Sequence, residues 1–223
     1  SINRDTMTDI RQYSLDGTDM GLYQTHIGYA YTYGDGGKVS CENLCEAVSL
    51  LFGGIPINRY VVTNQDSMPY INNLVGGVEV TVPNNDLAEE YPDLYEGAQV
   101  TLDATTIKPF LQYRDTSIDF SNEGRMERQR AFAMSYVNKV KSMDKSHIEK
   151  LWDSLDTMKD YLQTSITKNQ YINLADFIKK SELTDDSFIK LEGQDQVGKI
   201  HDEFYPDEDA LQQLIIDLFY EKV

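Results

Sequence analysis

Residues 40–83, SCENLCEAVSLLFGGIPINRYVVTNQDSMPYINNLVGGVEVTVP, contain the clearest secondary-structure signals in this chain. Ser40 can cap a helix that runs through Glu42 to Phe52, and Gly53-Gly54 marks its end. Asn58–Thr63 follows as a short stretch rich in aromatic and β-branched residues, which is typical of a strand. The first half of the stretch therefore predicts a helix followed by a strand.

The second half repeats this order. Ser67 can cap a helix that ends before Gly76-Gly77, and Val78–Val82 alternates between apolar and polar residues up to Pro83. Two strands separated by a helix indicate a βαβ-like unit. We therefore expect an α/β protein with a mixed central sheet and helices on both faces, an α/β/α sandwich.

The second half of the chain is mainly helical in pattern, whereas residues 83–100 are expected to form a polar loop. Apolar residues recur at helical spacing from Arg125 to Met143 and, after the capping-box pair Ser146 and Glu149, as far as Leu162. Further helices are expected over 173–180 and from Asp207. We therefore expect a single domain over 1–223, with a core at 1–142 and a helical part at 143–223.

Composition limits the possible partners. The chain has 223 residues, 40% of them hydrophobic, and a formal net charge of −17. This hydrophobic content supports a packed core, whereas the acidity disfavours binding to nucleic acid or to anionic lipid surfaces. No apolar run approaches the roughly 20 residues of a membrane helix.

Positive charge is concentrated in one place. Four of the seven arginines lie between residues 114 and 130, in YRDTSIDFSNEGRMERQR (113–130). Arg125 and Arg128 are three residues apart near a predicted helix start, with Gln129 beside them, and Arg114 can fold back toward them. Arginine binds phosphate or carboxylate at two points, and helix N-termini favour anions. The segment predicts a compact anion site; the alternative is pairing with neighbouring Asp and Glu on the surface.

Other reactive residue types give weaker signals. Cys41 and Cys45 are four residues apart in a predicted helix, which favours packed thiols over a disulfide or a zinc site. His26 precedes an aromatic run, and a role in the core or in a pocket wall is favoured over catalysis. The glycines at 34, 36 and 37 indicate a turn.

Five blocks in this order resemble the LytR–CpsA–Psr family over about residues 1–142, most closely its versions from anaerobic Firmicutes. They are SINRDT (1–6), YAYTYGDG (29–36), GGIPINRYVV (53–62), NNLVGGVEVTVP (72–83) and the arginine segment ending in GRMERQ (124–129).

The resemblance implies a Mg²⁺-dependent (or Mn²⁺-dependent) phosphotransferase with an apolar channel for a lipid tail. Its donor would be a polyprenyl-pyrophosphate-linked glycan, its acceptor a peptidoglycan hydroxyl, and its location the cell-wall face of the membrane. An N-terminal membrane helix and a strand carrying an acidic metal ligand are expected upstream of residue 1. We expect the channel to be lined by Leu44, Val48, Leu51, Ile71 and Leu74.

The resemblance also assigns residues. It implies catalytic roles for Arg4, Asp5, Arg114, Arg125 and Arg128, with Asp5 as a metal ligand, and substrate contacts for Gln129, Gln112 and His26. Two of these positions depart from the family pattern, since many members carry arginine at 112 and lysine at 26. The alternatives are a pyrophosphate hydrolase on the same scaffold and a non-catalytic lipid-glycan binder that regulates the envelope.

Overall fold

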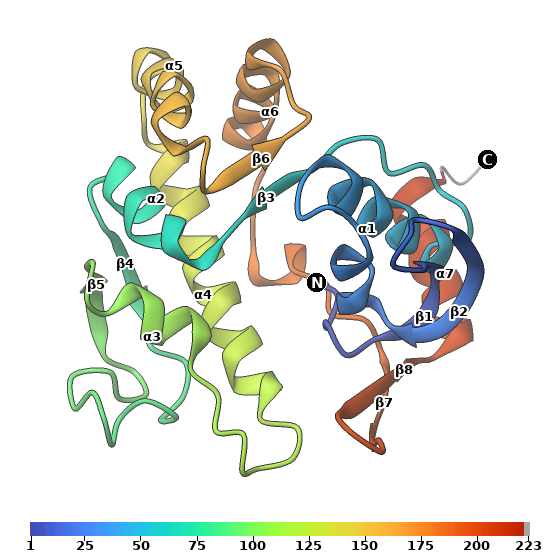
Figure 1. The fold of residues 1–223 in the computed structure, drawn as a ribbon. Helices are drawn as coiled ribbons and strands as arrows, with labels where there is room; N and C mark the ends of the chain where they lie inside the picture. Colours follow the sequence, from blue (N-terminus) through green and yellow to red (C-terminus); the bar gives the residue numbers. More distant parts are fainter. Residues whose placement is uncertain (221–223) are drawn as a thin grey trace. The chain divides into compact units, whose positions relative to one another are not determined.

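The computed structural model of this protein describes residues 1–220, except for the side chains of Asp156 and Asp185. The described chain divides into two compact units, one formed by residues 1–60 and 189–223 and the other by residues 61–188 (Figure 1). We call them the terminal unit and the middle unit. This division does not follow the expected boundary at residue 142, because both ends of the chain belong to the same unit.

The terminal unit contains two antiparallel hairpins and two long helices. β1 (Met7–Tyr13) pairs with β2 (Asp19–His26), and β7 (Gly193–Val197) pairs with β8 (Asp202–Pro206). Two short 3₁₀ turns, η1 (Ile27–Tyr29) and η2 (Tyr31–Tyr33), lead into α1 (Lys38–Leu51), and α7 (Glu208–Phe219) follows β8.

The core of the terminal unit joins segments from both ends of the chain. Ile10 of β1, Ala47 of α1 and Phe204 of β8 are buried in one cluster. The backbone N–H of Phe204 donates to the carbonyl of Asp5 at 2.9 Å, which holds the first residues of the chain against β8.

The described middle unit has two small antiparallel sheets and five α-helices. β3 (Val61–Thr63) pairs with β6 (Leu162–Thr164), and β4 (Val78–Thr81) pairs with β5 (Gln99–Leu102). The other elements are η3 (Gln65–Ser67), α2 (Met68–Leu74), α3 (Ile107–Gln112), α4 (Asn122–Lys141), α5 (Lys145–Ser154), η4 (Leu155–Met158), α6 (Lys168–Lys180) and η5 (Asp185–Ser187).

One apolar cluster holds the middle unit together. Val78 and Val80 of β4 point inward and pack with Phe110 of α3 and Phe132 of α4. The expected apolar face of the arginine-bearing helix is confirmed, because Tyr136 and the residues that follow it along this face pack against the same cluster.

The α/β class is confirmed, as a mixture of helices and small sheets. The expected βαβ unit is wrong, because β3 and β4 lie in different sheets and each pairs with an antiparallel partner. The part after residue 142 is not purely helical either, since it contains β6, β7 and β8. In particular, α5 ends at Ser154, so Leu162 lies in a strand instead of in the expected helix.

Candidate functional site

A pocket of about 310 Å³ lies in the middle unit. Three parts of the unit form its wall: the segment that leads from β3 into α2, the C-terminal end of α3, and the first turns of α4. The lining residues are Thr63, Asn64, Gln65, Met68, Leu111, Gln112, Arg125, Gln129 and Phe132. Three of the sequence-predicted site residues, Gln112, Arg125 and Gln129, are therefore brought together.

The lining combines one cation with an apolar wall. Arg125 is the only charged residue among those that line the pocket, and Met68, Leu111 and Phe132 supply the apolar surface. The Nε2 atom of Gln112 is buried, and it has no hydrogen-bond partner within the described part of the chain. An amide donor left unsatisfied in this way can bind a ligand oxygen. The pocket therefore suits an amphipathic anion.

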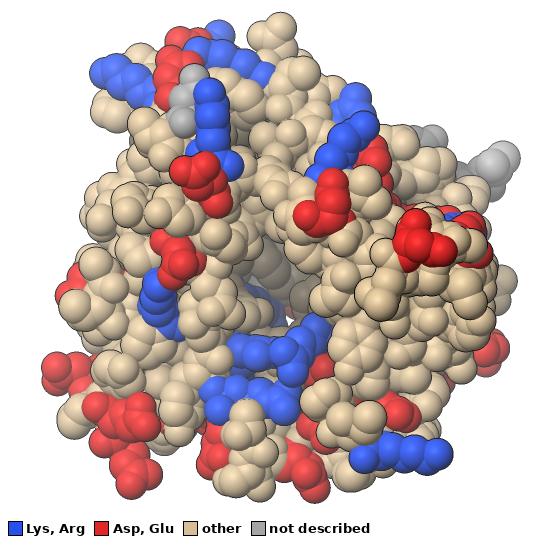
Figure 2. Space-filling view, viewed as in Figure 1, with Lys and Arg blue, Asp and Glu red and all other residues tan. Residues whose placement is uncertain are grey.

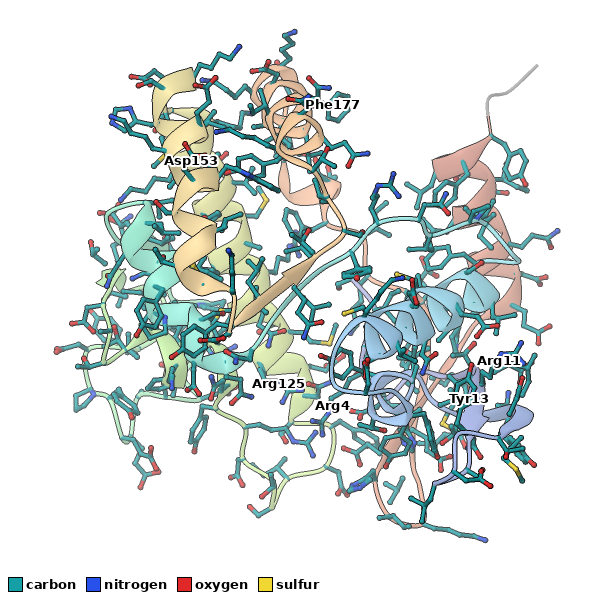
Figure 3. The ribbon with its side chains drawn as sticks, turned by 45° about the horizontal axis from the view of Figure 1, so that its top comes forward. Arg4, Arg11, Tyr13, Arg125, Asp153 and Phe177 are labelled. Carbon is teal, nitrogen blue, oxygen red and sulfur yellow. The ribbon has the colours of Figure 1, made fainter. Side chains whose placement is uncertain are left out.

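Arg125 lies near the start of α4 (Figure 3). Its guanidinium donates to Oδ1 of Asn122, a residue that is 3% exposed and belongs to the same helical turn. This bond fixes the arginine side chain beside the N-terminal end of the helix, where backbone N–H groups also favour negative charge.

Arg128 differs from the expectation. It is 0% exposed and does not line the pocket. Its Nε donates to the carbonyl of Phe110 at 2.9 Å, and its two Nη atoms donate to the carbonyl of Tyr113 and to the side chains of Asn84 and Asp86. The guanidinium is therefore engaged by the protein itself. Its direct catalytic role, expected from sequence, has no support in this geometry.

Arg128 and Gln129 together cap the C-terminal end of α3. The carbonyls of Phe110, Leu111 and Tyr113 accept from Arg128 Nε, Gln129 Nε2 and Arg128 Nη2, respectively. Carbonyls at the end of a helix have no partner within the helix and favour cations. The RQ pair therefore holds the segment that carries Gln112 and leads into Arg114.

A glycine permits this arrangement. A Cβ added to Gly124 would lie 2.2 Å from Oδ2 of Asp86, the atom that lies 2.5 Å from Arg128 Nη1. Asn84 Nδ2 also donates to the carbonyl of Gly124 at 3.0 Å. Sequence reasoning missed Asn84 and Asp86, because nothing in a polar loop signals a contact with a helix about 40 residues further on.

The other predicted arginine of this segment, Arg114, is half-buried in the loop between α3 and α4 and does not line the pocket. Its catalytic role stays a prediction. None of the residues expected to line an apolar channel lines this pocket. Leu44, Val48 and Leu51 pack in the core of the terminal unit, and Leu74 packs against the core of the middle unit.

Arg4 and Asp5 lie in the terminal unit. Asp5 is 6% exposed, and its Oδ1 lies 3.3 Å from Nε of Arg4, whose side chain is 55% exposed. The backbone is held on both sides, since Gly28 N–H donates to the Arg4 carbonyl at 3.0 Å and Phe204 N–H donates to that of Asp5. The pair therefore presents an exposed cation on a rigid segment.

His26 is 9% exposed at the end of β2. Its Nε2 lies 2.9 Å from the carbonyl of Asp202, and because a carbonyl only accepts, Nε2 carries the proton. This agrees with the core or wall role favoured by its sequence context. Its expected substrate contact stays a prediction.

No group of three or more His, Cys, Asp or Glu side chains in residues 1–220 is arranged to hold a metal ion. Mg²⁺ bound to a substrate needs fewer protein ligands, because one or two carboxylates combine with phosphate oxygens and water. Asp5 fits such a role, and the neighbouring Thr6 Oγ1 is a buried oxygen with no hydrogen-bond partner within the described residues.

The fold and the pocket thus define an α/β protein with a site for an amphipathic anion. The sequence matches the LytR_cpsA_psr family over residues 1–218, and the chain belongs to this family. The match extends through both units and beyond the stretch over which the sequence blocks are recognised.

Among curated proteins, the chain is 28% identical over 179 residues to the polyisoprenyl-teichoic acid–peptidoglycan teichoic acid transferase TagU of Enterococcus faecalis. The match covers 78% of this chain and 52% of that protein, so the chain spans about half the length of this curated relative.

Two solved structures share the fold. TagV of B. subtilis superimposes with a TM-score of 0.70 at 21% identity, covering 98% of this chain and 82% of that one. TagT bound to LIIa-WTA gives a TM-score of 0.71 at 21% identity, covering 98% and 76%. Within residues 1–220, none of the helices combines the length and apolarity that crossing a membrane requires.

Proposed function

We propose that this protein transfers a phosphoglycosyl group from a polyprenyl-pyrophosphate-linked glycan to a hydroxyl of peptidoglycan. The observation that carries the proposal is the pocket of the middle unit, which sets one arginine and an unsatisfied amide donor against an apolar wall. A polyprenyl pyrophosphate has the same two parts, an anionic head and an apolar tail. Family membership and the name of the E. faecalis relative support the same reaction.

The reaction exchanges one P–O bond for another. The acceptor hydroxyl oxygen attacks the phosphorus that bears the glycan, and the bond from that phosphorus to the bridging oxygen breaks. Polyprenyl monophosphate leaves with the bridging oxygen, and the hydroxyl proton passes to solvent or to a basic group. Negative charge grows on the leaving phosphate and on the non-bridging oxygens during this displacement.

Arg125 is suited to stabilising that charge, because its guanidinium is held in place by Asn122 before the substrate arrives. Gln112 adds a neutral hydrogen bond from its buried Nε2. Met68, Leu111 and Phe132 offer apolar contact to the first isoprene units, and the volume of about 310 Å³ suits the head of the donor.

A divalent ion, Mg²⁺ or Mn²⁺, completes the proposal. When bound, it would supply charge neutralisation at the pyrophosphate oxygens. Asp5 is the residue proposed to hold it, and Arg4 would orient that carboxylate. Because donor and acceptor belong to the membrane and the wall, we place the reaction at the outer face of the cytoplasmic membrane.

One reaction separates this function from its two alternatives. The full-length protein is incubated with a lipid-linked glycan labelled in the sugar, with Mg²⁺ and with peptidoglycan strands. The proposal predicts label covalently attached to peptidoglycan and loss of that product when EDTA is added. Release of the glycan phosphate into water would identify a hydrolase. Folded protein that binds the donor and leaves it intact would be a non-catalytic binder.

A further inference from the structure

A second and larger cavity in the middle unit has no role in the mechanism above. It measures about 640 Å³ and lies between residues 90–95 of the loop after β4 and the strand β5, next to the start of α3. The loop from residue 83 to residue 98 has 16 residues without helix or strand. Loops of that length are uncommon in compact units and are usually functional.

This loop is held in place by buried side chains and by backbone hydrogen bonds. Leu87 and Leu94 are 1% and 2% exposed in the core cluster. Val82 N–H donates to the Ala98 carbonyl at 2.9 Å, and Gly97 N–H donates to the Val82 carbonyl at 2.8 Å. The loop therefore has a fixed shape, and preorganised surfaces bind ligands at a lower entropic cost.

The lining of the second cavity is aromatic and acidic. Tyr91 and Tyr95 line it together with Glu90 and Asp93, and no Lys or Arg is among its lining residues. Tyr95 is 55% exposed, although its chain neighbour Leu94 is buried. Neither Glu90 nor Asp93 makes a side-chain hydrogen bond or an ion pair in the described chain, so their oxygens remain able to accept bonds from a ligand.

These features select one chemical class of ligand. The carboxylates are not arranged for a metal ion, since the described residues contain no suitable cluster. They would repel phosphate or pyrophosphate, which excludes the donor head. A sugar presents hydroxyl and amide donors to carboxylates and an apolar C–H face to tyrosine rings.

The two cavities are joined by α3. Thr106, at the N-cap of α3, lines the second cavity, whereas Leu111 and Gln112, at its other end, line the first. Six residues of helix span about 9 Å, so the cavities lie within reach of one glycan chain.

We propose that the second cavity binds the uncharged N-acetylated amino-sugar backbone of the acceptor glycan. This inference rests on the proposed function and specifies how the acceptor is recognised. The negative charge of the second cavity would keep the pyrophosphate of the donor out of it.

A binding titration tests this without requiring turnover. A tetramer of N-acetylglucosamine is titrated into ¹⁵N-labelled protein and into the variants Tyr95→Ala and Asp93→Asn. Tyr23→Ala is the matched control, because Tyr23 is 46% exposed on β2 of the other unit. We expect saturable shifts at residues 90–101, an affinity about tenfold lower in Tyr95→Ala, and no change in the control.

The outcomes separate the two proposals. Sugar binding at residues 90–101 in a protein without transferase activity would overturn the reaction and keep the sugar site. Transfer to peptidoglycan with an unchanged acceptor KM in Tyr95→Ala, and no shifts with the tetramer, would overturn the sugar site alone. A response to oligolysine in place of the sugar would also overturn it.

Discussion

Arg128 is a buried guanidinium whose hydrogen bonds all go to the protein itself. It joins the loop at 84–86 to the end of α3 and makes four hydrogen bonds while remaining fully buried. Its neighbour in the same block, Arg125, lines the pocket. The spacing of the two arginines alone does not separate these roles. The sequence does not indicate that Asp86 and the carbonyls at the end of α3 lie beside Arg128 and not beside Arg125.

Arg128→Ala is expected to destabilise the protein and not merely to slow the reaction. It leaves the buried carbonyls at the end of α3 without their donor, and a buried acceptor left unsatisfied typically costs about 1–3 kcal/mol. The carboxylate of Asp86 is 40% exposed and is solvated by water in the variant. Urea denaturation measures the free energy of unfolding. The control is Arg130→Ala, an exposed residue of the same helix that is expected to change it by less than about 0.5 kcal/mol. Equal free energies of unfolding for the two variants would contradict a stabilising role for Arg128 between the loop at 84–86 and the end of α3.

Gln112 stands at a position where the resemblance to the family led us to expect arginine. Its buried amide nitrogen has no partner among the described residues and the side chain lines the pocket. Gln112→Arg is expected to tighten binding of a polyprenyl-pyrophosphate analogue, because a charge-assisted hydrogen bond is about twice as strong as a neutral one. Isothermal titration of both folded proteins measures this, and unchanged affinity would remove position 112 from the site.

At the scale of elements, helix ends were easier to predict than strand partners. Gly53-Gly54 and Gly76-Gly77 follow α1 and α2 as expected, all with positive φ. The caps themselves often differ: Asp35 Oδ1, and not Ser40, accepts from the first N–H groups of α1. A Cβ on Gly34 would lie 2.4 Å from the nitrogen of Ser40, so the close approach of this turn to α1 requires glycine there.

Helix α5 offers a pH test of the same kind of cap. Oδ1 of Asp144 accepts from the backbone N–H of His147 at 2.9 Å, and this bond lowers the pKa of Asp144 to about 2. Since the folded pKa lies below the model-peptide value of 3.8, the stabilisation is present above about pH 4 and is lost as pH falls toward 2.

Asp144→Asn should remove that pH dependence while keeping a capping oxygen. We expect the wild-type free energy of unfolding to fall more steeply than that of the variant between about pH 4 and pH 2. Glu149→Gln on the same helix controls for the loss of one negative charge. Identical pH profiles for the wild type and Asp144→Asn would show that titration of Asp144 does not contribute to the stability.

For the whole molecule, family membership was predictable and the division of the chain was not. The five sequence blocks indicated the family, and the match extends over residues 1–218. The pairing of β3 with β6 joins segments about 100 residues apart, and strands of three residues carry little periodicity. Figure 2 shows both acidic and basic side chains over this face of the molecule.

The central claim is that the pocket at Arg125 carries out transfer from a polyprenyl-pyrophosphate-linked glycan. The most direct measurement compares the rate of label transfer to peptidoglycan by full-length wild type, Arg125→Ala and the control Arg130→Ala. We predict that Arg125→Ala lowers the rate about 100-fold or more at unchanged stability, whereas Arg130→Ala keeps the wild-type rate. Wild-type transfer by a folded Arg125→Ala protein, or no transfer by the wild type with Mg²⁺ and both substrates present, would contradict the claim.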